Sequence, residues 1–136
     1  MDKECICVKC VYNEKKESAI LNIMENEETV TIHFESTFFQ LKLTGKNYFE
    51  VLVKLRGELE KEGIKLLCKG CAKNVYPSGM ISDMGMGRNA YTLFLGLPAR
   101  MDSLVDIFNE CSESEYASVL EQQVYFEQWI RSIECK

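Results

Sequence analysis

The sequence contains a single histidine and lacks the residue groups on which most hydrolases and transferases depend. His33 falls on the polar side of the alternating run 29–35, which favours a solvent-exposed imidazole over a general base. No family-type signature surrounds any cysteine, so a Cys–His nucleophile pair is not supported. Residues 84–88 contain a Gly-x-Gly but lack the third glycine and the Lys-Ser/Thr of a phosphate-binding loop. The sequence therefore favours a binding module over an enzyme, with no catalytic residues and no cofactor.

Long apolar runs and an excess of basic charge are also missing. No run approaches the roughly 18 apolar residues of a membrane-spanning helix. The N-terminus has neither the basic region nor the apolar core of a signal peptide, so we expect a cytoplasmic protein that does not enter a membrane. The net charge of −5 and the pI near 5.0 disfavour nucleic acid, because binding to phosphates depends on clustered lysine and arginine. A basic protein partner fits this charge better.

Cysteine, by contrast, is abundant, with seven residues in 136. An odd number excludes complete intramolecular pairing, and free thiols are the default in a reducing compartment. Two pairs have the spacing of zinc knuckles, so four thiolates could close a tetrahedral structural site. Both pairs also lie in runs typical of strands, where cysteine acts as a small buried apolar residue. We favour the second interpretation and expect no bound zinc; the ligands of the zinc alternative would be Cys7, Cys10, Cys68 and Cys71.

The polar and apolar pattern predicts an α+β fold, a mainly antiparallel sheet with one helix packed across it and a flanking C-terminal helix. No repeat, low-complexity tract or linker divides the chain, so residues 1–136 form a single predicted domain. Residues 5–12 are expected as an edge strand. Further strands are expected over residues 18–25, 29–35, 39–43, 64–68 and 90–95. Residues 104–108 fit either a short helix after Asp102 or a strand, because periodicity over five residues does not separate the two.

The first predicted helix begins at Asn47, which Glu50 follows in a capping pattern, and ends at Gly63. Its buried stripe consists of Tyr48, Leu52, Leu55 and Leu59, with Phe49 and Val53 alongside. Its water-facing side is predicted to carry Lys54, Arg56, Glu58 and Lys61.

The second predicted helix starts after a cap at Ser112 or Ser114 and has apolar residues on two faces. Tyr125 and Trp129 lie opposite a stripe made of Tyr116, Val119, Leu120, Phe126, Ile130 and Ile133. A helix that packs once needs only one apolar face. We expect the N-terminal segment to cover the second face; the alternative is another protein.

Residues 74–91 form an irregular run with one proline, three glycines and three methionines. Such a run inside a small domain is usually functional or disordered, and its apolar content argues for an ordered surface loop. One arginine among tyrosines and methionines is the mixture enriched at interface cores. An ion pair between Asp83 and Arg88 is expected to hold the loop. The predicted binding residues are Tyr76, Ser78, Met80, Asp83, Met84, Arg88 and Tyr91.

Four segments together resemble a family of small bacterial proteins of unassigned activity, some of them found in toxin-immunity neighbourhoods. The segments are Leu67-Cys-x-Gly70, Asn74-Val-Tyr-Pro-Ser-Gly-Met80, Asp83-Met-Gly-x-Gly-Arg-x-Ala-Tyr91 and Leu104-Val-Asp-Ile-Phe108. The resemblance implies that the 74–91 loop belongs to the fold, and it brings no catalytic assignment. A cysteine at position 71 is not a fixed feature of that pattern, which weakens the zinc alternative.

Two classes of function follow. The first is a protein-binding module, specifically an immunity-type protein that covers the basic active surface of a toxin; the acidic charge and small size favour it. The second is a small-ligand-binding or enzymatic domain with a pocket at the 74–91 loop. In that alternative Arg88 is an anion clamp with Tyr76, Ser78 and Asp83 as polar neighbours. We favour the first class.

Overall fold

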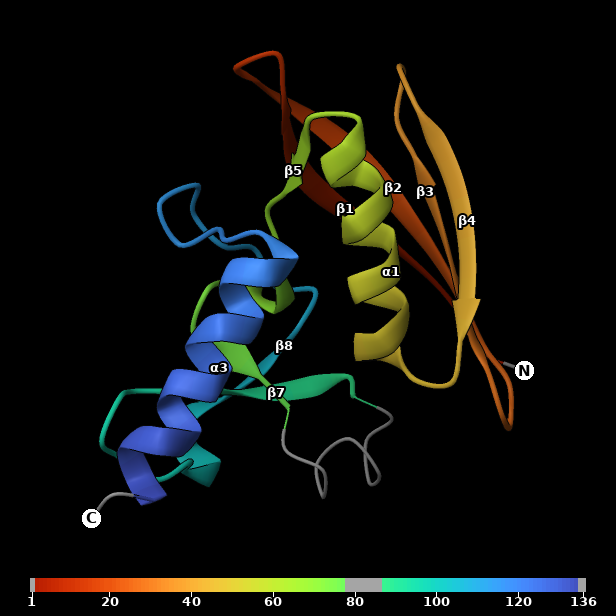
Figure 1. Ribbon diagram of the computed structural model, residues 1–136. Helices are drawn as coiled ribbons and strands as arrows, with labels where there is room; N and C mark the ends of the chain where they lie inside the picture. Colours follow the sequence, from red (N-terminus) through yellow and green to blue (C-terminus); the bar gives the residue numbers. More distant parts are fainter. Residues whose placement is uncertain (1, 78–86, 135–136) are drawn as a thin grey trace.

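The computed structural model describes residues 2–77 and 87–134, and its N-terminal half is a five-stranded antiparallel sheet (Figure 1). The strand order is β4-β3-β2-β1-β5. The first four strands follow one another along the chain as β1 (Asp2–Tyr12), β2 (Lys15–Glu25), β3 (Val30–Glu35) and β4 (Gln40–Gly45). The turn between β1 and β2 is only Asn13 and Glu14, whose positive φ angles of 52° and 65° suit a two-residue hairpin. The predicted α+β class with a mainly antiparallel sheet is confirmed.

The edge-strand prediction for residues 5–12 holds for only part of β1. β5 (Ile64–Leu66) pairs antiparallel with Cys10–Tyr12, and the Leu67 amide donates to the Lys9 carbonyl at 2.9 Å. No described strand pairs with the part of β1 before Lys9 on that side. The end of β1 is therefore interior to the sheet, because a segment more than fifty residues later in the chain returns beside it.

The helix α1 (Tyr48–Lys61) lies across one face of the sheet (Figure 1). Asn47 caps it, because its Oδ1 accepts from the Glu50 amide at 2.8 Å, and Gly63 follows its end with a φ of 74°. The predicted stripe of Leu52, Leu55 and Leu59 is confirmed as fully buried. It packs against the inward side of β3, whose Val30, Ile32 and Phe34 are also fully buried.

Arg56 is not on the water-facing side of α1, and this prediction was wrong. The side chain is only 1% exposed. Its Nη1 donates to the Gly70 carbonyl at 3.2 Å and to Gln122 Oε1 at 2.6 Å, and its Nη2 donates to the Ala117 carbonyl at 2.7 Å. Two later segments of the chain cover this flank of the helix. The helical pattern predicts that a charged residue at this position faces water, because the pattern does not reveal that segments distant in sequence cover it.

A second, three-stranded sheet follows the order β6-β7-β8. Its strands are β6 (Val75–Tyr76), β7 (Asn89–Thr92) and β8 (Leu104–Asp106), all antiparallel. Short 3-10 turns at Lys69–Cys71 and Met101–Ser103 precede β6 and β8. β8 decides the open question over residues 104–108 in favour of a strand. The strand predicted over 90–95 ends at Thr92, since the chain beyond it turns toward the C-terminal helix.

The C-terminal helix α3 (Val119–Glu134) begins later than predicted. Ser112 and Glu115 do exchange capping hydrogen bonds, at 2.9 and 3.3 Å, yet these close only a turn. The same pattern recurs at Ser118 and Glu121, with bonds of 2.8 and 3.1 Å, and there the helix starts. Between these two capping pairs, the Ala117 amide donates to the Cys71 carbonyl and the Ala117 carbonyl accepts from Arg56. Both groups are thus unavailable for helical hydrogen bonds, so no helix forms at Ser112.

The face of α3 that carries Tyr125 and Trp129 packs inward, and the expected cover by the N-terminal segment was wrong. The Tyr125 hydroxyl donates to the Leu93 carbonyl at 3.2 Å, and Trp129 Nε1 donates to the Leu97 carbonyl at 2.8 Å. The segment after β7 thus covers this face, while Leu120 is 69% exposed. Of the helices in the described residues, none has both the length and the apolar character of a membrane span.

Leu55→Ala is expected to lower the free energy of unfolding by about 2 to 5 kcal/mol, because the side chain is fully buried and the change leaves a cavity. Urea unfolding followed by circular dichroism measures the loss. Lys54→Ala, at the exposed neighbouring position, is the control and should change stability by no more than about 0.5 kcal/mol. A loss below about 1 kcal/mol for Leu55→Ala would contradict the packing of α1 described above.

Candidate functional site

The predicted binding residues divide into those that the structure describes and those that it does not. Tyr76, Arg88 and Tyr91 are described, and Tyr76 pairs directly opposite Tyr91 in the small sheet. The predicted irregular run 74–91 therefore begins and ends in paired strands. The positions outside the described residues are Ser78, Met80, Asp83 and Met84.

Tyr76 packs between the two helices. Its ring stacks on Phe126 of α3, with centroids 4.0 Å apart and planes 13° apart, and meets Phe49 of α1 edge-on at 5.1 Å. Aromatic contacts of this kind stabilise packing beyond the area they bury. Tyr76 therefore joins α1, α3 and the small sheet at one point.

Arg88 is held by two carboxylates from different parts of the chain. Its Nε donates to both oxygens of Asp106 at 3.1 Å, and its Nη1 and Nη2 donate to Glu4 at 2.8 and 3.0 Å. The predicted partner Asp83 lies outside the described residues. Arg88 directly precedes β7, and its ion pairs connect this point to β8 of the small sheet and to β1 of the large one, which gives Arg88 a structural role.

The surroundings of Arg88 compensate its charge. The guanidinium lies 5.3 Å from the Tyr48 ring centroid and 4.9 Å from that of Phe108, within reach of cation–π attraction. The hydrogen bonds from Arg88 hold the pKa of the Glu4 carboxyl below its ordinary value, and the same bonds raise the pKa of Arg88. A guanidinium engaged in this way weighs against its use as an anion clamp.

Just beyond Tyr91, the chain makes a tight turn whose large apolar side chains face solvent. The Leu97 amide donates to the Phe94 carbonyl at 3.1 Å, and Gly96 at the third position of the turn has a φ of 83°, which glycine adopts without strain. The side chains of Phe94, Leu95 and Leu97 are 53%, 52% and 53% exposed. These three residues are called the apolar turn below.

α3 holds the backbone of the apolar turn from behind. Trp129 Nε1 donates to the Leu97 carbonyl and Ser132 Oγ accepts from the Gly96 amide, both at 2.8 Å. In Figure 1 the segment after β7 runs beside the C-terminal half of α3. The turn is thus fixed in its backbone, and its exposed side chains project from a rigid support.

Met101 is a further exposed apolar residue and lies beside Tyr91. Its side chain is 68% exposed, and its sulfur accepts a hydrogen bond from the Tyr91 hydroxyl at 3.5 Å. Arg100 and Asp102 form an exposed ion pair on either side of it, with N–O distances of 3.1 Å. An apolar centre with a charged rim is the usual anatomy of a protein interface. Of the predicted binding residues that the structure describes, Tyr91 lies beside Met101.

The apolar turn was missed in the sequence because residues 90–95 were assigned to a strand, in which half of the side chains would be buried. A signal was present. Residues 94–98 place three large apolar residues around a glycine and end in a proline, a composition typical of a turn. Apolar residues in a tight turn have few neighbours to bury them, so the same segment predicts exposure.

The four cysteines of the zinc alternative do not face a common point. Cys7 is exposed on the outer side of β1, whereas Cys10, Cys68 and Cys71 are fully buried. Burial raises the pKa of Cys10 to about 11 and that of Cys68 well above its ordinary value, which opposes the thiolate form that binds metal. Within residues 2–77 and 87–134, no group of three or more His, Cys, Asp or Glu side chains is arranged to hold a metal ion.

No protein-family model and no curated protein matches the sequence. The resemblance to small bacterial proteins thus stays a prediction. The function proposed below is therefore argued from the contacts and exposure of the described residues.

Arg88→Ala should lower the free energy of unfolding by about 1 to 3 kcal/mol at pH 7, because it leaves two carboxylates without their cation. Arg88 lowers the pKa of Glu4 in the folded protein from 4.5, so the part due to Glu4 is present above pH 4.5 and is lost as the pH falls through the lowered value. The difference between wild type and variant should therefore shrink from pH 7 to about pH 3 in urea titrations.

Arg100→Ala is the matched control, since its ion pair is exposed on both sides and should contribute no more than about 1 kcal/mol. A wild-type advantage over Arg88→Ala that stays constant or grows on acidification would contradict the role given to Glu4.

Proposed function

We propose that this protein is a protein-binding module that docks its partner through the apolar turn, with Met101 and Tyr91 beside it. One observation carries the proposal: α3 anchors the backbone of the turn while the three large apolar side chains remain more than half exposed. Apolar area stabilises a fold only where it is removed from water. Clustered exposed apolar residues on a rigid support are instead typical of interaction sites.

The geometry of the turn favours tight association. Its backbone is already ordered by Trp129 and Ser132, so binding does not have to order it. A phenylalanine and two leucines can enter pockets of a partner, while the exposed pair of Arg100 and Asp102 stays at the solvated rim. The apolar turn would then slow dissociation, the step that most often separates strong from weak complexes.

The specific form of the proposal is an immunity-type protein that neutralises a basic toxin. The support is the net charge of −5, which steers a basic partner toward this chain. Charge would raise the association rate, and the apolar turn would provide the lasting contact. Together they would cover the toxin's active surface.

The alternative, a ligand-binding or enzymatic domain at the 74–91 loop, has weaker support. It uses Arg88 as its cation, and the guanidinium is already bonded to Glu4 and Asp106. Its other polar residues, Ser78 and Asp83, lie outside the described residues. Among its residues, Tyr76 is engaged in packing between the helices.

Leu95→Asp should reduce partner binding at least tenfold, a loss of about 1.4 kcal/mol or more, because a carboxylate at the turn is costly to desolvate in an apolar interface. Leu120→Asp is the matched control. Leu120 is also exposed, at 69%, and lies about 18 Å along α3 from Ser132. Immobilised wild type and both variants are compared in capture from a host lysate, with mass spectrometry and with folding checked by circular dichroism.

Wild type and Leu120→Asp should capture the same protein, and Leu95→Asp should lose it. Equal capture by all three would exclude the apolar turn as the docking surface. Loss in both variants would show a general effect of added negative charge and would also count against it.

With the captured partner, the association rate should fall as salt shortens the Debye length from about 30 Å at 0.01 M to about 3 Å at 1 M. The dissociation rate should change little, because the apolar turn is not screened. Stopped-flow or surface-based kinetics separate the two rates. An association rate that does not depend on salt would contradict electrostatic steering and, with it, the proposal of a basic toxin as partner. It would not bear on docking through the apolar turn, which the Leu95→Asp experiment tests.

A further inference from the structure

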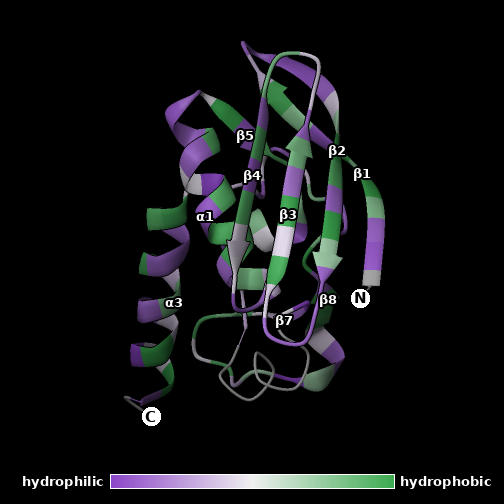
Figure 2. Cartoon of the chain, turned by 90° about the vertical axis from the view of Figure 1, so that its right-hand side faces the viewer, coloured by the Kyte–Doolittle hydropathy of each residue, from purple (hydrophilic) through white to green (hydrophobic). Residues whose placement is uncertain are grey.

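The outer face of the large sheet, opposite α1, carries a pocket apart from the apolar turn. Figure 2 looks onto this face, where β2, β3 and β4 lie in front of α1. The pocket has a volume of ≈ 340 Å³, toward the lower end of the range of about 300 to 1,000 Å³ for small-molecule sites. Four adjacent strands line it with Lys3, Cys5, Asn22, Met24, His33 and Lys42.

The strand register brings these side chains together. Cys5 pairs with Asn22, Asn22 with His33, and His33 with Lys42, so one row across the sheet takes one residue from each strand. Lys3 stands in the neighbouring row, because alternate residues of a strand share a face. The two lysines therefore come from the outermost strands of the pocket, β1 and β4, and border it from opposite sides.

The two lysines of the pocket form no ion pair with any described residue. Lys3 and Lys42 have no carboxylate partner among the described residues, whereas Lys54, Lys61, Lys65 and Lys69 each have one. Of the acids at the pocket, Glu4 is among its lining residues but its carboxylate bonds to Arg88, and Glu35 pairs with the imidazole of the lining residue His33 at 3.0 Å. A local excess of cations in a chain of net charge −5 points to an anion as ligand.

Other parts of the pocket lining are less polar. Met24 and the thiol of Cys5 offer apolar contact, as do the aliphatic stems of the two lysines. The side-chain amide of Asn22 has no hydrogen-bond partner among the described residues. It lies in the middle of the row, where its NH₂ group can donate to an oxygen of a ligand. The lining thus combines cationic ends with an apolar floor.

We propose that this pocket binds a small amphipathic carboxylate. Lys3 and Lys42 hold the carboxylate, Asn22 donates to it, and Met24 and Cys5 contact the apolar body of the ligand. The site is independent of the apolar turn, because none of its lining residues belongs to the 91–101 segment.

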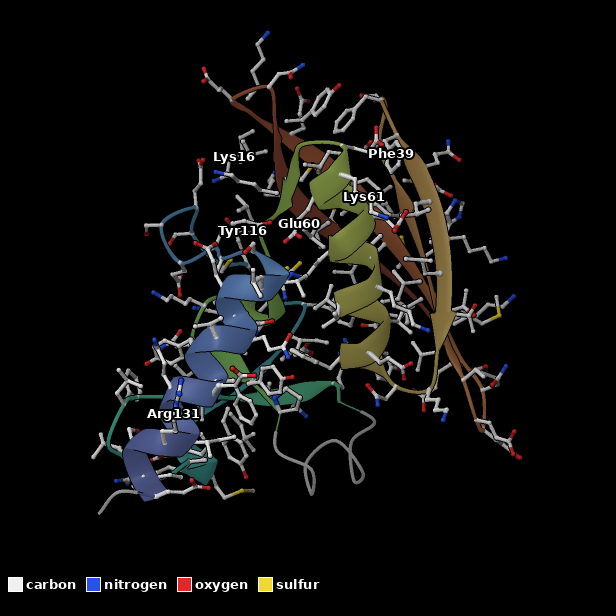
Figure 3. All side chains as sticks on the ribbon, in the orientation of Figure 1. Lys16, Phe39, Glu60, Lys61, Tyr116 and Arg131 are labelled. Carbon is white, nitrogen blue, oxygen red and sulfur yellow. The ribbon has the colours of Figure 1, made fainter. Side chains whose placement is uncertain are left out.

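The probe is 2-naphthoate, and 2-naphthamide is its neutral isostere. In ¹H–¹⁵N spectra, 2-naphthoate should shift the amides around Cys5, Asn22 and His33, and 2-naphthamide should bind at least about tenfold more weakly. The double variant Lys3→Gln/Lys42→Gln should lose at least about tenfold in affinity for 2-naphthoate. Lys16→Gln/Lys46→Gln removes the same charge outside the pocket, with Lys16 near the β1–β2 turn in Figure 3, and should bind like wild type.

Alkylation of Cys5 provides a second readout with an internal control. Cys7 is exposed on the same face of β1 but lines a different depression, with Ile20 and Gln40. Saturating 2-naphthoate should slow the reaction of Cys5 with iodoacetamide by at least about tenfold and leave that of Cys7 unchanged, as measured by peptide mass spectrometry. The proposal is overturned if Cys5 is not protected, if both thiols are protected equally, or if Lys3→Gln/Lys42→Gln binds 2-naphthoate as tightly as the control variant.

Discussion

A buried arginine bonded to neutral acceptors is the contact on which the arrangement of the helices depends. Arg56 of α1 donates to Gln122 of α3 and to two backbone carbonyls, and its Nε has no partner among the described residues. Gln122, itself 1% exposed, donates in turn to the carbonyls of Gly70, Ala72 and Val75. A buried charge that loses its hydrogen bonds is strongly destabilising. Any shift of α3 would break this network, so the network sets the position of α3.

The same junction carries the support for the apolar turn. Glu60 lies one helical turn after Arg56 in α1, and its carboxylate accepts a hydrogen bond from the Val119 amide at 2.7 Å, which holds the start of α3. Figure 3 places Glu60 near Tyr116, which precedes this helix. At its other end, α3 holds the turn through Trp129 and Ser132. The exposure of the apolar turn is therefore a consequence of how α1 fixes α3, and a change in the core would reach the proposed docking surface through this helix.

Of the predicted binding residues that the structure describes, two make contacts that hold the fold together. Arg88 links the small sheet to β1 through Glu4, and Tyr76 stacks between the helices. Only Tyr91 lies beside exposed apolar surface, through its bond to Met101. The anionic-ligand pocket is on the far side of the large sheet from α1. The two proposed sites can thus be tested without mutual interference.

Elements whose signals are local can be predicted from the amino-acid sequence alone. The alternation over 29–35 gave the buried side of β3, and Asn47 with Glu50 marked the start of α1, because a strand face and a helix cap are set by residues a few positions apart. For the site, composition pointed to the region near Tyr91 and missed the apolar turn. Three features follow from the folded chain instead: Arg56 is buried, α3 starts at Ser118 and not at Ser112, and Trp129 faces inward. Each of these depends on segments distant in sequence, whose approach decides burial and is invisible to a local pattern.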